Sequence, residues 1–265
     1  MGVEKSDNSS DINVFIKILS IIGTIILENG GETSRAEEAV SRICHGYNKN
    51  VEVLVIPTGV FISVTEDDVT YNTLIKRVKK RTINLEKLDR VNTLSRELSE
   101  RRITLEEAMA QCCMISNSKK KKYNRWLIPV YTGLSSGLFS LLFNGMWFDF
   151  IIAFISGFIV QFIAMSFRQT DVFHFLMSLI GGVVCAVTAV LSVNLFGLGS
   201  VNIIIISSIM PLLPGLAMIK SIRDTMTGDL VSGTARLAEV VIVAVSLAVG
   251  AGVVLSVAKL LGGVI

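Results

Sequence analysis

The sequence contains few of the residues that most often perform catalysis or bind metals. Its 265 residues include only two histidines and four cysteines. The cysteines form no C-x-x-C pair, and Cys185 lies inside an apolar segment, so neither a metal site nor a disulfide framework is expected. The glycine-rich P-loop, the H-E-x-x-H pattern of zinc proteases and the G-x-S-x-G pattern of hydrolases are also missing. The sequence therefore predicts a protein that is not an enzyme and that uses no cofactor.

Charge is scarce in the second part of the chain. Of the 47 charged residues, 36 precede Tyr123, and the 143 residues from there onward carry only 11. With a mean hydropathy of +0.61, the chain is too apolar for a soluble protein. The net charge of +3 provides no concentrated basic face, so nucleic acid is not an expected partner. The change near residue 122 predicts a polar domain over residues 1–122 and a membrane domain over residues 123–265.

Residues 1–122 carry the signals of a small α+β domain, which we place in the cytoplasm. Apolar residues from Ile12 to Leu27 recur at helical spacing and end at Gly30-Gly31, a typical helix stop. A second helix is expected from residue 33 or 34 to about residue 47, with Ser34-x-x-Glu37 as its capping box.

The rest of this domain is predicted to contain a sheet followed by two helices. Stretches rich in β-branched residues, separated by turns at 57–59 and 66–68, predict a three-stranded antiparallel sheet over residues 51–56, 60–64 and 69–75. Helices are expected over residues 84–99 and 104–116, and the second of them begins with another capping box, Thr104-x-x-Glu107.

The membrane domain is predicted to be an α-helical bundle of about five transmembrane helices. A span needs about 20 mainly apolar residues, and five segments qualify: 126–143, 148–167, 173–195, 200–219 and 235–258. Lys and Arg residues occur in alternate connections, and such residues stay on the cytoplasmic side. They are Lys119 to Lys122, Arg125, Arg168, Lys220, Arg223 and Arg236. We therefore expect a multi-pass membrane protein, with its N-terminus in the cytoplasm and its C-terminus outside. The run Lys119 to Lys122 also suits anionic lipid headgroups.

Small residues recur inside the apolar segments. They form three groups: Gly133, Ser136 and Gly137; Gly181, Gly182 and Cys185; and Gly250 with Gly252. Small side chains let helices approach closely in lipid, where packing replaces the hydrophobic driving force. These groups predict tight helix packing rather than a binding site.

The stretch Met210-Pro211-Leu212-Leu213-Pro214-Gly215 interrupts an apolar segment. Each proline lacks a backbone donor and leaves a carbonyl group upstream without its helical partner. Irregular backbone at membrane depth occurs where it is buried in protein or lines a polar cavity, and transporters place substrates at such breaks. Pro211, Pro214 and Gly215 are therefore candidates for a substrate pathway, and a structural kink is the alternative. Gln161, inside the second span, either lines the same pathway or bonds a neighbouring helix.

Charged and small residues follow the break. Arg223-Asp224, Asp229, Gly233, Arg236 and Glu239 lie between or inside the last two spans. Charges that enter a span are functional candidates, and arginine binds carboxylates through two parallel hydrogen bonds. The alternative is an interfacial loop with local ion pairs, in which Arg236 and Glu239 pair at a spacing of three residues.

A second group of charges surrounds the Gly30-Gly31 turn. Glu28, Glu32, Arg35 and Glu38 are candidates for a gate or a binding site in the cytoplasmic domain. The alternative is that the acidic residues favour a helix start and that Arg35 pairs with one of them. An enzymatic site around Glu32, Arg35, His45 and Thr58 is a further hypothesis, although His45 has no partner nearby in sequence.

These residues resemble those of a known family. The stretch Gly30-Gly31-Glu32-Thr33-Ser34-Arg35-Ala36-Glu37 and the stretch Pro57-Thr58-Gly59-Val60 are similar to the N-terminal signature of the threonine/serine exporter family. The stretch from Met210 to Gly215, followed by Arg223-Asp224, Gly228-Asp229, Ser232-Gly233 and Arg236, resembles its second signature. The resemblance covers about residues 12–255.

The resemblance implies a secondary exporter of small carboxylate-bearing molecules in a bacterial inner membrane, with the C-terminus on the periplasmic or extracellular side. Full-length family members carry a second group of about five spans, which this chain of 265 residues lacks. It therefore resembles the split form, in which a second small membrane protein supplies the other half, and export of threonine, serine or dicarboxylates such as succinate is implied. An oligomer is expected. The alternative is a membrane-anchored enzyme or sensor whose N-terminal domain carries the activity.

Overall fold

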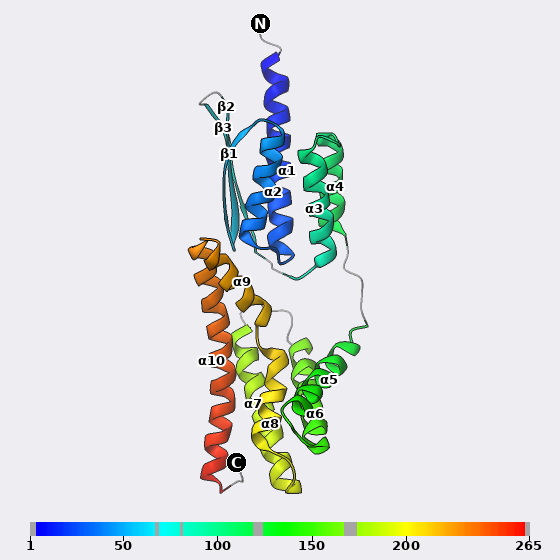
Figure 1. The fold of residues 1–265 in the computed structure, drawn as a ribbon, viewed down its shortest axis with the longest axis vertical. Coiled ribbons are helices and arrows are strands. Elements are labelled where there is room, and N and C mark those ends of the chain that lie inside the picture. Colours follow the sequence, from blue (N-terminus) through cyan, green and yellow to red (C-terminus); the bar gives the residue numbers. More distant parts are fainter. Residues whose placement is uncertain (1–3, 67–68, 80–81, 119–123, 167–173, 263–265) are drawn as a thin grey trace. The chain divides into compact units, whose positions relative to one another are not determined.

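The computed structural model describes residues 4–66, 69–79, 82–118, 124–166 and 174–262 (Figure 1). Contacts divide the chain into two compact units. The first contains Met1–Lys121 together with Lys220–Ala235, and the second contains Lys122–Ile219 together with Arg236–Ile265. The basic residues Lys119 to Lys122 and Arg168, which support part of the expected orientation, lie outside the described residues, as does part of the turn at 66–68.

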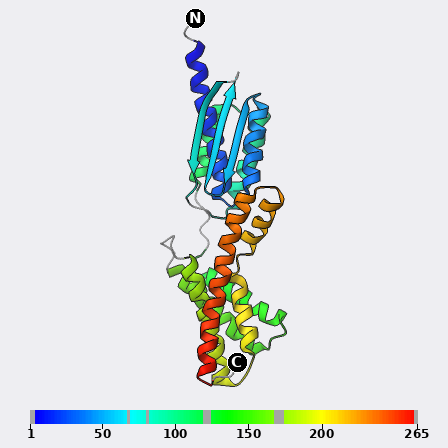
Figure 2. The ribbon, with the colours of Figure 1, turned by 90° about the vertical axis from the view of Figure 1, so that its left-hand side faces the viewer.

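The first unit contains a three-stranded antiparallel sheet covered on one face by helices (Figure 2). The elements run α1 (Glu4–Glu28), α2 (Thr33–Gly46), β1 (Asn50–Ile56), β2 (Gly59–Glu66), β3 (Val69–Arg77), α3 (Leu85–Ser99) and α4 (Leu105–Asn117). The strands pair in the order β1-β2-β3, with Val55 opposite Val60 and Ser63 opposite Thr73. The predicted α+β composition and all three predicted strands are confirmed.

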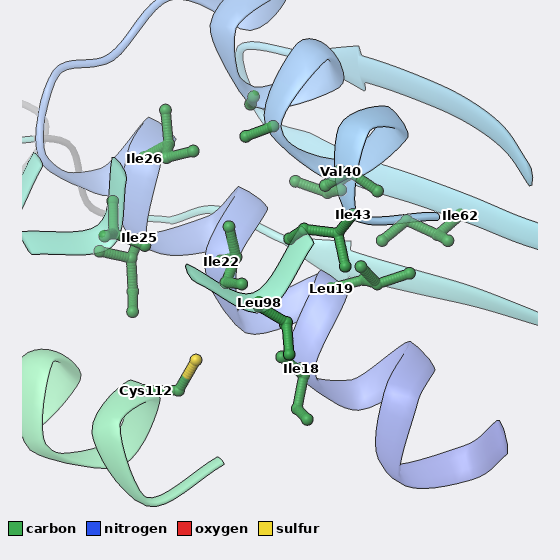
Figure 3. Packing of buried hydrophobic residues seen from close by; sticks show 14 of the residues in the cluster. Ile18, Leu19, Ile22, Ile25, Ile26, Val40, Ile43, Ile62, Leu98 and Cys112 are labelled. Atoms are coloured by element: carbon green, nitrogen blue, oxygen red, sulfur yellow. The ribbon is translucent and has the colours of Figure 1, made fainter. Parts of the chain in front are cut away.

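Helix α1 is the central helix of this unit, packed against α2, α3, α4 and the strands β2 and β3. Ile18, Leu19 and Ile22 are completely buried among residues from α2, α3 and the sheet (Figure 3). Full burial of such a side chain stabilises a fold by about 1.5–3 kcal/mol. The apolar character of α1 therefore follows from its central place in a packed core, since a helix that is apolar on most sides is buried.

Of the two predicted capping boxes, the one at α4 is confirmed and the one at α2 is wrong. At α4 the capping box is present: Thr104 Oγ1 accepts from the Glu107 N–H, and the Glu107 carboxylate accepts from the Thr104 N–H. At α2 the predicted box is wrong, because Glu32 occupies the cap position and no side chain caps the helix. Glu37 instead accepts a hydrogen bond from the Val55 N–H at 2.8 Å. A local signal could not show that this carboxylate faces the edge of a strand.

The second unit is helical. It contains α5 (Leu127–Leu142), α6 (Trp147–Ser166), α7 (His174–Phe196), α8 (Val201–Ile209) and the short 3-10 helix η2 (Met210–Leu212). The first residues of α9 (Gly215–Met226) and most of α10 (Leu230–Leu260) also belong to it. Among the described helices, α6, α7 and α10 are long and apolar enough to cross a membrane, and the bent pair formed by α8–η2 and α9 adds a fourth if it counts as one span. Helix α5 is shorter, with 16 residues, so a total of five spans stays a prediction.

Candidate functional site

The predicted span over residues 200–219 is broken into two helices. Residues Val201–Leu212 and Gly215–Met226 meet at an angle of 59°. Leu213, between them, is extended with φ −67° and ψ 136°, which is the conformation that a following proline imposes. The interruption predicted at Met210–Gly215 is therefore confirmed, and Pro214 is its physical reason. The predicted polar connection at 220–234 is mostly helical, because α9 continues to Met226.

Helices α9 and α10 are joined by a tight turn. Gly228 has a φ of +91°, a left-handed conformation that glycine adopts without strain. Asp229 caps α10, with its Oδ1 accepting from the Ser232 N–H at 3.0 Å. The Ser221 hydroxyl donates to the Gly233 carbonyl at 2.8 Å, and a Cβ at Gly233 would collide with the Thr225 hydroxyl. Asp229 and Gly233 thus have clear structural roles in this turn.

A cluster of charges forms where α9 meets the start of α2, within the first unit. The Arg223 guanidinium lies 3.0 Å from the Glu32 carboxylate, and Arg35 lies 3.8 Å from the other oxygen of the same carboxylate. Lys220 donates a hydrogen bond to the Gly30 carbonyl oxygen. In the sequence, Glu32 and Arg35 belong to the group around the Gly30-Gly31 turn and Arg223 to the group that follows the break. The structure brings the three together.

The backbone at residues 29–31 positions this cluster. Helix α1 ends in a Schellman turn: the Gly31 N–H bonds to the Ile26 carbonyl at 2.8 Å and the Gly30 N–H to the Leu27 carbonyl at 3.2 Å. Gly30 has a φ of +89°, so the predicted helix stop is confirmed. Glu32 follows at the start of α2, where the helix dipole favours a negative charge.

Exposure differs sharply between the partners in this cluster. The Glu32 side chain is 13% exposed, whereas Arg35 and Arg223 are 54% and 56% exposed. Ion pairs with exposed partners contribute only about 0.2–1 kcal/mol. The pairs therefore orient the two guanidinium groups more than they hold the fold together, and both guanidinium groups stay open to solvent.

Other predicted site residues lie elsewhere. The Glu38 carboxylate pairs with Arg42 at 3.3 Å and is 71% exposed, while Asp224 is completely buried. The Glu28 carbonyl oxygen accepts from the Thr82 N–H at 2.7 Å. Pro211, Pro214, Gln161, Arg236 and Glu239 belong to the second unit, in which Arg236 is buried and Gln161 is half-buried. His45 is exposed at the end of α2.

Two residues were missed by sequence reasoning. Lys220 was read only as a topological marker. Asp149 is 1% exposed, and its carboxylate accepts from the Met146 N–H at 2.8 Å and from the Ser200 N–H at 2.9 Å. It therefore joins the loop before α6 to Ser200, which precedes α8 and lies 51 residues after Asp149. A lone acidic residue in the first turn of an apolar helix was the available signal.

Glu37 provides a test of the electrostatics of the first unit. Burial raises the pKa of the Glu37 carboxyl, the Val55 N–H lowers it, and the charge of Asp229 raises it further. A raised pKa means that the folded state holds its proton more tightly than the unfolded state. The stabilisation from Glu37 is then complete below the ordinary pKa of 4.5 and is lost as the pH rises through the folded pKa.

Glu37→Gln is accordingly expected to raise the unfolding temperature at pH 7. Glutamine keeps an oxygen that accepts from the Val55 N–H and carries no charge beside Asp229. The gain over the natural chain should shrink as the pH falls toward 4.5. Thermal unfolding of the full chain in detergent between pH 4 and 8 measures this, with Glu52→Gln on an exposed position of β1 as control. A lower unfolding temperature at pH 7 would contradict the prediction.

Comparison with known proteins identifies relatives over almost the whole chain. The chain is 23% identical to a threonine/serine exporter of Corynebacterium glutamicum, over 98% of this chain and 54% of that protein. It is 22% identical to the probable succinate transporter subunit YjjP of Klebsiella aerogenes, over 80% of this chain and 82% of that protein. It is 23% identical to the protein of the same name from Escherichia coli K12, over 91% of this chain and 94% of that protein.

These comparisons differ in coverage. The chain spans about half the length of the corynebacterial relative and most of the length of the two YjjP proteins. No solved structure matches the chain. The family model of the threonine/serine exporters, ThrE, matches residues 17–258. With this match and with helices apolar enough to cross a membrane, the chain belongs to the ThrE family of threonine/serine exporters and is a multi-pass membrane protein.

Proposed function

We propose that this chain is a subunit of a secondary transporter that exports small carboxylate-bearing metabolites across a bacterial inner membrane. The substrates are threonine and serine, or dicarboxylates such as succinate, as the names of the relatives suggest. An ion gradient supplies the energy, in keeping with the absence of a P-loop from the sequence. The N-terminal domain lies in the cytoplasm and the C-terminus on the opposite side, which follows from the distribution of basic residues.

One observation carries the proposal: an arginine that already holds a carboxylate lies on the helix that begins directly after the break. Helix α9 starts at Gly215, and Arg223, eight residues later, pairs with the Glu32 carboxylate. Guanidinium groups suit carboxylates because their planar donors match both oxygens. Broken helices in transporters provide backbone groups for substrates at the break itself. We infer that Pro211, Pro214 and Gly215 form part of the pathway and that Arg223 receives the substrate carboxylate.

A second membrane protein is proposed to complete the transporter. The chain covers only 54% of the corynebacterial exporter, and two relatives of similar length are named as subunits. A separate chain that supplies the other half accounts for both facts. The complete transporter is then at least a hetero-oligomer in the lipid bilayer.

Flux in proteoliposomes tests the function. Labelled threonine, serine and succinate are compared, with this chain alone and together with the candidate second subunit. Gradient-dependent flux of one substrate class, seen only with both subunits, is the expected result. No flux of any of the three in either preparation would contradict the proposal and favour a role as a membrane-anchored sensor or enzyme.

Pro214→Ala is expected to reduce this flux several-fold while the protein still inserts into the membrane. Alanine restores a backbone donor and releases Leu213 from its extended conformation, so α8 and α9 can join into a straighter helix. Pro129→Ala is the control, because Pro129 lies in the first turn of α5, where proline leaves no donor missing from the helix. Unchanged flux in Pro214→Ala would remove the break from the pathway.

A further inference from the structure

We propose that Glu32 is an internal ligand of the carboxylate site, so that the substrate carboxylate and Glu32 compete for the same arginines. The inference rests on the proposed function and adds a role for the N-terminal domain. Helix α9 is held by this domain when Glu32 occupies Arg223, and it is released when a substrate carboxylate takes the place of Glu32.

The geometry of the cluster supports an exchangeable carboxylate. Arg223 approaches one oxygen of Glu32 at 3.0 Å and Arg35 approaches the other at 3.8 Å. The amino group of Lys220, one turn before Arg223 on α9, lies against the Gly30 carbonyl oxygen. Two guanidinium groups from two elements thus meet a single carboxylate within the first unit, and a third cation, Lys220, bonds the backbone two residues before it. This is the arrangement expected of an anion site that already contains its anion.

Competition follows from the charges. A substrate carboxylate that binds Arg223 adds a second negative charge beside Glu32, and two carboxylates at such close range disfavour each other. The Arg223 and Arg35 side chains are more than half exposed, so a solute reaches them without unfolding the domain. Ion pairs of this exposure are weak and exchange readily. Substrate binding therefore weakens the contact between Glu32 and Arg223. By thermodynamic linkage, that contact weakens substrate binding by the same factor.

The contact also fixes the position of α9. Two side chains of α9, Lys220 and Arg223, bond to residues 30–32, and they lie one turn apart on that helix. Because α9 is continuous from Gly215, release of Arg223 frees the same helix that begins at the break. The N-terminal domain then holds α9 through Glu32, and binding of the substrate carboxylate to Arg223 releases the helix.

Glu32→Gln is the test, with Glu86→Gln as the matched control. Glu86 lies near the start of a helix, as Glu32 does, and pairs with an arginine, Arg90, at 3.3 Å. For the complete transporter in proteoliposomes, Glu32→Gln is expected to lower the substrate concentration at half-maximal flux by about two- to fivefold, whereas Glu86→Gln leaves it unchanged. An unchanged or higher concentration in Glu32→Gln, with flux preserved, would overturn the inference and leave the proposed function standing.

Hydrogen–deuterium exchange gives a readout that does not depend on transport. Saturating substrate is expected to speed exchange in residues 29–35 and 220–226 of the natural chain. In Glu32→Gln the exchange is already fast without substrate, and substrate adds little. If a substrate that is transported speeds exchange in neither segment, the inference is overturned. If none of threonine, serine or succinate is transported or alters exchange, both the inference and the proposed function fail.

Discussion

Gly250→Ala is expected to destabilise the membrane-embedded unit by about 1–3 kcal/mol, the usual cost of overpacking. Gly250 on α10 faces the backbone of α7: an added Cβ would collide with the Leu179 carbonyl oxygen and lie 3.0 Å from the Val183 nitrogen. The obstacle is backbone, which cannot turn aside as a flexible side chain does. Gly182 on α7 meets α10 in the same way, with a Cβ 3.1 Å from the Ala251 nitrogen. The two glycines therefore let α7 and α10 cross backbone to backbone.

Gly252→Ala is the matched control for this prediction. Gly252 lies on the same helix two residues later, and a Cβ there would meet nothing within 4 Å. Alanine favours a helix over glycine by up to about 1 kcal/mol, so Gly252→Ala should leave the unfolding temperature unchanged or raise it. Thermal unfolding of the full chain in detergent compares the two variants. Equal stability of Gly250→Ala and Gly252→Ala would contradict the close crossing of α7 and α10.

Predictions from local signals were the most successful. The Gly30-Gly31 stop, the three strands and the capping box at Thr104 each depend on residues a few positions apart, and each is confirmed. The expectation of tight packing also holds for Gly182 and Gly250, but not for Gly252, whose position faces open space. Spacing alone does not show which small residue faces a neighbouring helix.

Interactions between distant residues could not be predicted in this way. Glu32 and Arg223 are 191 positions apart, and nothing in the composition near either one indicates the other. Glu37 was assigned to a helix cap because the local pattern fits one, yet the edge of β1 offers it a better donor, the Val55 N–H. The break in the apolar segment at 200–219, by contrast, follows from a local signal, because Pro214 restricts the backbone of Leu213.

The candidate site depends both on local signals and on contacts between distant residues. Arg223 was identified as a candidate because a charge in an otherwise apolar region stands out, whereas Glu32 and Arg35 were candidates because they surround the Gly30-Gly31 turn. Their grouping required the fold, which places the α2 start beside α9 within one unit. Arg223 from the predicted pathway group therefore joins Glu32 and Arg35 from the predicted cytoplasmic group, whereas other members of both groups lie elsewhere.

Arg223→Gln is expected to reduce transport of a carboxylate substrate by about 10- to 100-fold. Hydrogen bonds to charged groups contribute about 1.5–3 kcal/mol, which corresponds to a loss of that size in affinity. Glutamine keeps a polar side chain but lacks both the charge and the planar fork that matches a carboxylate. Because the Arg223 side chain is 56% exposed, its replacement should change the unfolding temperature little.

Arg90→Gln separates this effect from the general loss of a surface charge. Arg90 is 55% exposed and pairs with a single carboxylate, that of Glu86, at 3.3 Å. Its exposure and pairing thus match those of Arg223, but it lies on α3. Flux in proteoliposomes is measured for both variants after quantification of the inserted protein. Full flux with Arg90→Gln and a large loss with Arg223→Gln would support α9 as the carrier of the substrate carboxylate. Equal flux in the two variants would show that Arg223 serves only to hold Glu32, and the substrate would then bind elsewhere in the transporter.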